Sequence, residues 1–327
     1  MAKDESISIS KKMLRGGRVA YLDIAKGITL ILMVLGHNEF PGSTAIINKV
    51  IFLFHMPLFF IVCGYLTLPK AKFDTEKKFS KLIKPYIIVF GLTIVPYYFF
   101  YGDFDVFLAF ILMKTRFLFG YEGHFGIGPI WFLPCYFFAN YIISRAKERF
   151  TLNEIAGGAL IVFTISLFAS KYLGGLPFLF YQTSIGILFI IWGYQCKERN
   201  IVKSKLFLGL GFLSSLVCLK WGYFSMYSCE CKLWIFQIIA GLFCTLMLFE
   251  LSKKIKTNKL LQFASIHSLT ILCVHSFDWS LGISSRIVAL LSIPSYLTFI
   301  FYFLFVSVGL FVVWVYKRAK VILLRND

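Results

Sequence analysis

The residues best suited to chemistry lie in an apolar segment between Arg18 and Asn38, which reads RVAYLDIAKGITLILMVLGHN. This segment is long enough to cross a bilayer, yet it contains Asp23, Lys26 and His37. A charged side chain inside a membrane costs on the order of 3 kcal/mol by insertion scales, so such residues are seldom kept without a function. A neutral histidine can take a proton from a hydroxyl group, and a lysine can bind an anion. The segment therefore holds a candidate base and a candidate anion site.

Helical spacing places these three side chains on one face of the segment. At about 100° per residue, Asp23, Lys26 and His37 fall within roughly 60° of one another. Lys26 and His37 are about three turns apart, which is roughly 16 Å along the helix axis. A polar stripe on an apolar helix must face protein or a cavity, so we expect the site along this face. The alternative for Lys26 is a lysine that snorkels to the interface while paired with Asp23.

Two further apolar segments contain histidines. His55 lies near the middle of FLFHMPLFFIVCGYL, where Pro57 frees a backbone carbonyl and lets the helix bend or open beside the histidine. The segment SIHSLTILCVHSFDW contains His267, His275 and Asp278. A lone histidine in an apolar helix is more often a packing residue. The convergence of His37, His55 and His275 from three segments favours a functional site.

The composition predicts an all-α polytopic membrane protein. Hydrophobic residues make up 58% of the 327 residues, and the 15% that are charged form short clusters between long apolar runs. Lipid forces such runs into internally hydrogen-bonded helices. From the number of these runs we expect about ten transmembrane helices. The loops between them are too short to bury a core, so we expect no soluble domain. The predicted spans are 19–38, 46–68, 85–101, 129–144, 155–173, 178–195, 206–224, 233–251, 265–283 and 296–316.

The segment 103–127 does not fit this pattern. Lys114 and Arg116 interrupt its short apolar run, so we interpret the segment as an interfacial or re-entrant piece. An eleventh span is the alternative. It would reverse the side assigned to every later loop, which the distribution of positive charge disfavours.

The positive charges predict the orientation of the chain. Most of the 34 Lys and Arg residues fall in alternate connections, as cytoplasmic loops require. Both termini are therefore expected in the cytoplasm, with tails over 1–18 and 317–327 around a transmembrane domain over 19–316. The net charge of +18 does not indicate nucleic-acid binding, because the excess lies in loops and not on one soluble face.

The first two histidine segments resemble a known family. LDIAKGITLILMVLGH followed by FHMPLFFIVCGYL is similar to the opening of the acyltransferase-3 family of integral membrane acyltransferases. The similarity is greatest to its fucose 4-O-acetylase-like branch, whose members commonly read D-I-A-K-G and F-H-M-P-L-F-F. KLIKPYI at 81–87, the patch IWFLPCYF beginning at Ile130 and the phrase ending at His275 extend the resemblance over most of the chain.

Two positions depart from the pattern of that family. The broad family usually has arginine where Lys26 stands, so this chain offers a point charge in place of bidentate phosphate recognition. Relatives often have a tyrosine three residues before the histidine at 275, where this chain has Leu272.

The resemblance implies transfer of an acyl group, usually acetyl, from acyl-coenzyme A to a hydroxyl of a cell-surface or lipid-linked carbohydrate. Such transfer requires a base for the hydroxyl proton and a donor for the developing oxyanion. His37 is the candidate general base, and His55 is a second candidate catalytic residue, as a second proton carrier or as an oxyanion donor. Lys26, steadied by Asp23, is expected to bind the phosphates of acetyl-CoA. The distance between Lys26 and His37 is comparable to the length of a pantetheine arm.

His275 and Trp131 are candidate supporting residues, although most aromatic residues here are expected to face lipid or form interfacial belts. No metal is expected. The expected partners are the carbohydrate acceptor and membrane lipid, in the cytoplasmic membrane of a bacterium, and the oligomeric state stays open.

A transporter or flippase for a polysaccharide or an acylated intermediate is the alternative, because it too needs polar residues in mid-membrane. A non-catalytic scaffold would not need Lys26 and His37 on one face.

Overall fold

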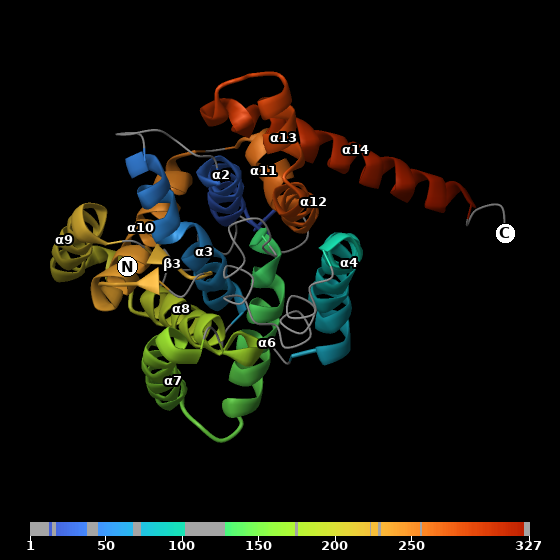
Figure 1. Cartoon of the computed structure of the whole chain (residues 1–327). Coiled ribbons are helices and arrows are strands. Elements are labelled where there is room, and N and C mark those ends of the chain that lie inside the picture. Colours follow the sequence, from blue (N-terminus) through green and yellow to red (C-terminus); the bar gives the residue numbers. More distant parts are fainter. Residues whose placement is uncertain are drawn as a thin grey trace.

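The chain folds into packed helices, as the composition predicts (Figure 1). The computed structural model describes residues 13–14, 18–37, 45–67, 73–101, 128–173, 176–222, 224–227, 230–255 and 257–323. The α-helices are α2 (Ala20–Gly36), α3 (Ala45–Thr67), α4 (Thr75–Tyr101), α6 (Phe132–Ala146), α7 (Leu152–Leu173), α8 (Phe180–Glu198), α9 (Lys205–Trp221), α10 (Trp234–Lys254), α11 (Lys259–Ile266), α12 (Ser268–Leu281), α13 (Ile283–Leu290) and α14 (Thr298–Leu323).

Short elements complete the described ranges. The antiparallel pairs are β1 (Met13–Leu14) with β2 (Arg18–Val19) and β3 (Phe224–Ser225) with β4 (Glu230–Cys231). Single turns of 3₁₀-helix are η3 (Gly128–Trp131), η4 (Pro177–Leu179), η5 (Ile201–Lys203) and η6 (Ser295–Leu297). The segment 103–127, interpreted above as re-entrant or interfacial, lies outside the described residues.

Within the described ranges, five helical segments are long and apolar enough to cross a membrane, and a sixth is added if α11 and α12 count as one broken span. The five are Ile46–Leu66, Leu152–Ala169, Pro177–Glu198, Trp234–Lys254 and Ser295–Tyr316. Each of the ten predicted spans overlaps a helix. However, α2, α6 and α9 have only 17, 15 and 17 residues, slightly less than a bilayer core needs. The number of spans and the side of the termini therefore stay predictions.

The span predicted over 265–283 differs most from the structure. Its helix begins earlier, at Lys259, and is bent by 73° where α11 meets α12 around His267. The side chain of Asn258 caps the start of α11 by accepting a hydrogen bond of 3.0 Å from the backbone N–H of Leu261. α11 then packs across α2 at Gly27, where a Cβ atom would overlap the carbonyl oxygen of Leu261. The bend thus coincides with a close contact in which α11 lies on α2.

α3 lies at the centre of the helices and packs against α2, α8 and α10. Glycines permit these close approaches. A Cβ atom at Gly64 would overlap the carbonyl oxygen of Ile190 in α8, and one at Gly241 of α10 would lie 2.8 Å from the carbonyl oxygen of Leu53. That carbonyl is the one that Pro57 deprives of its helical partner. α3 nevertheless remains one continuous helix across Pro57, so the helix does not open beside His55.

Gly64→Ala is expected to lower the free energy of unfolding by about 1–3 kcal/mol, because the added methyl group would push α3 away from α8. The matched control is Gly91→Ala in α4, where no described atom lies within 4 Å of the new methyl group. That control is expected to keep or slightly raise Tm, since alanine favours helix. Thermal unfolding in detergent measures both variants. Equal Tm values for both would refute the close packing of α3 on α8.

Candidate active site

Three histidines from three helices meet in one cluster. His37 follows the last residue of α2, His55 lies in the middle of α3, and His275 lies in α12. The ring centroid of His37 lies 6.4 Å from that of His55 and 5.1 Å from that of His275. His55 and His275 are buried, whereas His37 is partly exposed. The convergence expected from the sequence is therefore present, with His37 in the central place.

Backbone carbonyls fix the proton positions of two of these rings. Nδ1 of His37 lies 2.8 Å from the carbonyl oxygen of Met33, and Nδ1 of His55 lies 3.0 Å from that of Ile51. A carbonyl oxygen only accepts hydrogen bonds, so each Nδ1 bears the proton. In the neutral form, Nε2 of each ring then carries the lone pair, as a general base requires.

Aromatic rings line the cluster. The ring of Phe52 lies 6.1 Å from that of His37 and 4.8 Å from that of His55, and the ring of Trp279 lies 6.4 Å from that of His37. Gly128 of η3, with φ of +57°, leaves just enough room for Trp279, because a Cβ atom there would lie 3.1 Å from the indole. Neither aromatic residue stood out in the sequence. Their spacing was the available signal, because Phe52 and Trp279 lie one helical turn from His55 and His275.

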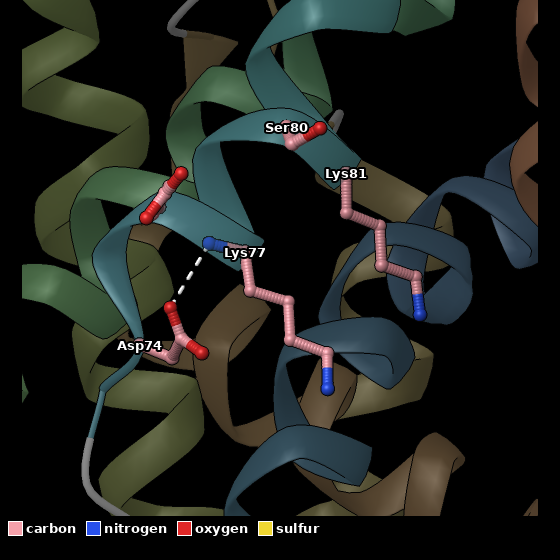
Figure 2. A pocket seen from close by; sticks show the side chains of 5 residues that line it. Asp74, Lys77, Ser80 and Lys81 are labelled. Atoms are coloured by element: carbon pink, nitrogen blue, oxygen red, sulfur yellow. Dashed lines mark hydrogen bonds between the residues drawn. The ribbon is translucent and has the colours of Figure 1, made fainter.

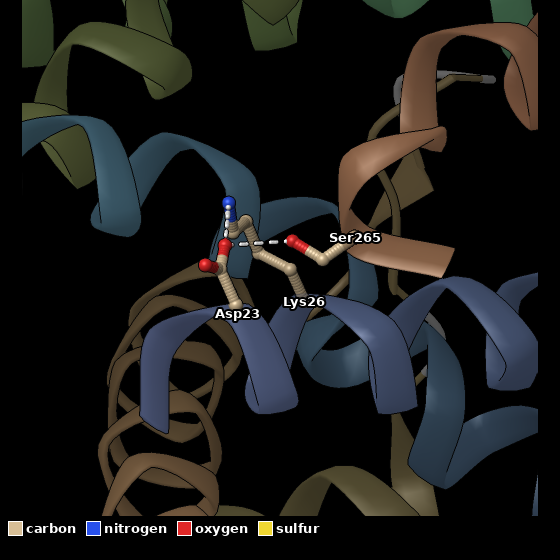
Figure 3. A network of polar contacts seen from close by, with 3 residues as sticks. All are labelled: Asp23, Lys26 and Ser265. Carbon is tan, nitrogen blue, oxygen red and sulfur yellow. Dashed lines mark hydrogen bonds and ion pairs between the residues drawn. The ribbon is translucent and has the colours of Figure 1, made fainter. Parts of the chain in front are cut away.

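Asp23 and Lys26 form a second polar group, near the start of α2. Nζ of Lys26 lies 2.7 Å from Oδ1 of Asp23, and the same oxygen accepts a 2.8 Å hydrogen bond from the hydroxyl of Ser265 in α11 (Figure 3). Asp23 is 4% exposed, whereas the Lys26 side chain is 23% exposed. Ser265 was not singled out from the sequence. Asp23 is thus held by two donors, while Lys26 keeps access to its surroundings.

The polar stripe of α2 faces the broken span and not lipid, as its helical spacing predicts. Ser265 of α11 contacts the stripe at Asp23, and His275 of α12 contacts it at His37 through nitrogens 3.2 Å apart. The two halves of the bent pair therefore reach the two ends of the stripe.

Other residues singled out from the sequence lie elsewhere. The ring of His267 packs against Phe263 at the break between α11 and α12, with centroids 4.4 Å apart. Trp131 is 3% exposed and stacks on Tyr227, so it faces protein and not lipid. The η3 turn packs against α12, but the ring contacts of Trp131 are with Phe132 and Tyr227.

Asp278 has a structural role near the end of α12. Its carboxylate accepts hydrogen bonds from the backbone N–H and the hydroxyl of Ser284, at 2.9 Å and 2.6 Å. Gly282, with φ of +61°, makes the turn between α12 and α13. The carboxylate therefore caps the first turn of α13 and holds the end of α12 in place.

A surface hollow lies at the start of α4, and no histidine of the cluster lines it (Figure 2). Asp74, Glu76, Lys77, Ser80 and Lys81 line it. A carboxylate oxygen of Asp74 accepts a 3.0 Å hydrogen bond from the backbone N–H of Lys77, which caps the helix. The hollow combines both signs of charge, so its lining alone does not indicate one kind of ligand.

Comparison with known proteins identifies a family. A family model described as an acyltransferase domain, of the acyltransferase-3 type, matches residues 19–318. Searches with the chain found no match among curated proteins and none among solved structures.

Proposed function

The chain belongs to the acyltransferase-3 family, and on that premise we propose that it transfers an acetyl group from cytoplasmic acetyl-CoA to a hydroxyl of a cell-surface or lipid-linked carbohydrate. The family makes the chain a multi-pass membrane acyltransferase. The donor, the acceptor and the cytoplasmic membrane as its location are parts of the proposal. Membership in the fucose 4-O-acetylase-like branch stays a prediction.

One observation carries the proposed reaction: Nδ1 of His37 lies 2.8 Å from the carbonyl oxygen of Met33, which leaves the lone pair of the neutral ring on Nε2. In the proposed step, Nε2 takes the proton of the acceptor hydroxyl as its oxygen attacks the thioester carbonyl carbon. The carbon–sulfur bond then breaks. The thiolate of coenzyme A takes the proton from His37 and leaves as the free thiol. The products are an acetyl ester and free coenzyme A, so atoms and charges balance.

The proposed donor site lies at the other end of α2. Lys26 would meet the donor phosphates, with its ammonium group held by Asp23, and the carboxylate of Asp23 in turn held by Ser265. Lys26 and His37 are about three helical turns, or roughly 16 Å, apart along α2, which suits a pantetheine arm between phosphates and thioester. This arrangement requires the Lys26 end of α2 to lie on the cytoplasmic side.

His55 would act as a second proton carrier. Its neutral tautomer, fixed by Ile51, has no proton on Nε2 and cannot donate a hydrogen bond to an oxyanion from that atom. The proton-carrier role is therefore favoured over the oxyanion-donor role.

His55→Gln is expected to lower the rate of transfer about tenfold or more, because the amide can replace the hydrogen bond to Ile51 but cannot carry a proton. Tm should stay at the parental value. Rate assays and thermal unfolding on the same preparation check both parts. A variant with the parental rate would end the catalytic role, and a parallel loss of rate and Tm would assign His55 to packing.

The proposed function is tested most simply by measuring base-labile acetate on the envelope carbohydrates of cells with and without the gene. Loss of the acetate, restored by the intact gene but not by the His37→Ala gene, is the expected result. A transporter or flippase could also use a broken span such as that of α11 and α12. In that case, carbohydrate would collect inside the cell, and the acetate content per unit of carbohydrate would not change.

A further inference from the structure

The Nδ1 atom of His37 has two neighbours. The carbonyl oxygen of Met33 lies 2.8 Å away, and Nε2 of His275 lies 3.2 Å away. Nδ1 bears the proton, because the carbonyl only accepts. Nε2 of His275 must then accept as well, so both acceptors share one N–H group. The contact therefore has a defined direction, from His37 to His275.

The proton of neutral His275 must accordingly lie on its own Nδ1. That atom is buried and has no hydrogen-bond partner in the part of the chain that the structure describes. Leaving a buried N–H group unsatisfied is unfavourable. The reverse tautomer would point the N–H group of His275 at the N–H group of His37. The unsatisfied Nδ1 is thus the consequence of presenting a lone pair to His37.

We propose that His275 is a positioning residue, which accepts the hydrogen bond of Nδ1–H of His37 and keeps Nε2 of His37 aimed at the acceptor hydroxyl. This inference rests on the proposed function. Once Nε2 of His37 has taken the hydroxyl proton, the ring is a cation and its Nδ1–H group is a stronger donor. Nε2 of His275 then stabilises that cation.

A neutral partner suits a site inside a membrane. In serine hydrolases the corresponding partner is a carboxylate, which orients the histidine and stabilises its cation. A carboxylate would add a buried charge to the resting site, and imidazole does not. The nearest carboxylate on α12 is that of Asp278, which is occupied by the two hydrogen bonds from Ser284. It therefore does not compete for His37.

The ring of His275 is held in place from a third helix. His275 is 0% exposed, and its ring lies 5.2 Å from that of Tyr302 in α14, at an interplanar angle of 78°. The ring of His37 packs on another side, at 5.1 Å between centroids. This packing fixes the direction of Nε2 without a charged group.

Two substitutions separate the hydrogen bond from the packing. His275→Phe keeps a ring of similar size but removes the acceptor, and it is expected to lower kcat about ten- to hundredfold with KM for acetyl-CoA unchanged. His275→Gln offers an amide oxygen to His37 and should recover most of the lost rate. The proposal is overturned by parental kcat in His275→Phe, or by equal losses in the two variants at parental Tm.

A second measurement does not depend on activity. Nitrogen NMR of the ¹⁵N-histidine-labelled full chain in lipid should show His37 protonated on Nδ1 and a scalar coupling from that nitrogen to His275 Nε2. His37→Ala and His275→Phe assign the two rings. Protonation of His37 on Nε2, or absence of the coupling, overturns the proposal. A parent chain that turns over no acetyl-CoA would refute the proposed function instead. The spectrum would still show whether Nδ1 of His37 donates a hydrogen bond to Nε2 of His275.

Discussion

Replacing His37 by alanine is expected to lower the rate of acetyl transfer by about 10²- to 10⁴-fold, the usual loss when a general base is removed. His37 is the central ring of the cluster, and its Nε2 is the atom proposed to take the hydroxyl proton. The substitution removes little buried apolar surface, since His37 is partly exposed. Insertion into the membrane and binding of acetyl-CoA should therefore persist. Initial rates with the purified variant measure the loss.

The matched control is His267→Ala. His267 lies in the same broken span but packs against Phe263, outside the cluster. Its replacement should leave the rate unchanged. A His37→Ala protein that is as fast as the parent would contradict the role of His37. Equal losses in both variants would indicate that any histidine change disturbs the fold.

Lys26→Met is expected to raise KM for acetyl-CoA about ten- to hundredfold with a smaller effect on kcat. A hydrogen bond to a charged group contributes about 1.5–3 kcal/mol, and contact with phosphates far from the reacting carbon is shared by ground and transition states. Lys26→Arg should keep most of the affinity, because it retains the positive charge. Steady-state kinetics and calorimetry with acetyl-CoA measure the effect.

A control is needed because Lys26→Met also leaves the buried carboxylate of Asp23 without its cation. Such an unpaired charge is destabilising in its own right. The double variant Asp23→Asn with Lys26→Met removes both charges, and the amide oxygen can still accept from Ser265. It should recover Tm but keep the high KM. Donor affinity equal to that of the parent in the double variant would refute donor binding by Lys26.

Much of the helical architecture could be predicted from the sequence, because long apolar runs in lipid have few other structures. The break near His267 could not be predicted. Neither proline nor glycine lies in the sequence ASIHSLT, and the bend accompanies a contact between Gly27 and Leu261, which lie far apart in the chain. Periodicity within one segment carries no information about such a contact between distant segments.

The residues of the candidate site likewise divide into those that the sequence predicts and those that depend on contacts between distant segments. His37, His55 and Lys26 stand out because polar residues are costly inside apolar segments. Ser265 does not, because serine is common in membrane helices and its partner Asp23 is 242 residues away in the chain. The close contact of His275 with His37 likewise required the packing of α12 near α2.

The most direct test of the central claim follows acetyl-CoA, labelled in the acetyl group, with the purified chain in lipid nanodiscs and an extract of envelope carbohydrate. The parent chain should release the free thiol of coenzyme A and place the label in a base-labile ester, and His37→Ala should do neither. If the parent released no thiol and formed no ester, the account of an acyltransferase site at His37 would be contradicted. Ester formation by His37→Ala at the parental rate would contradict it equally.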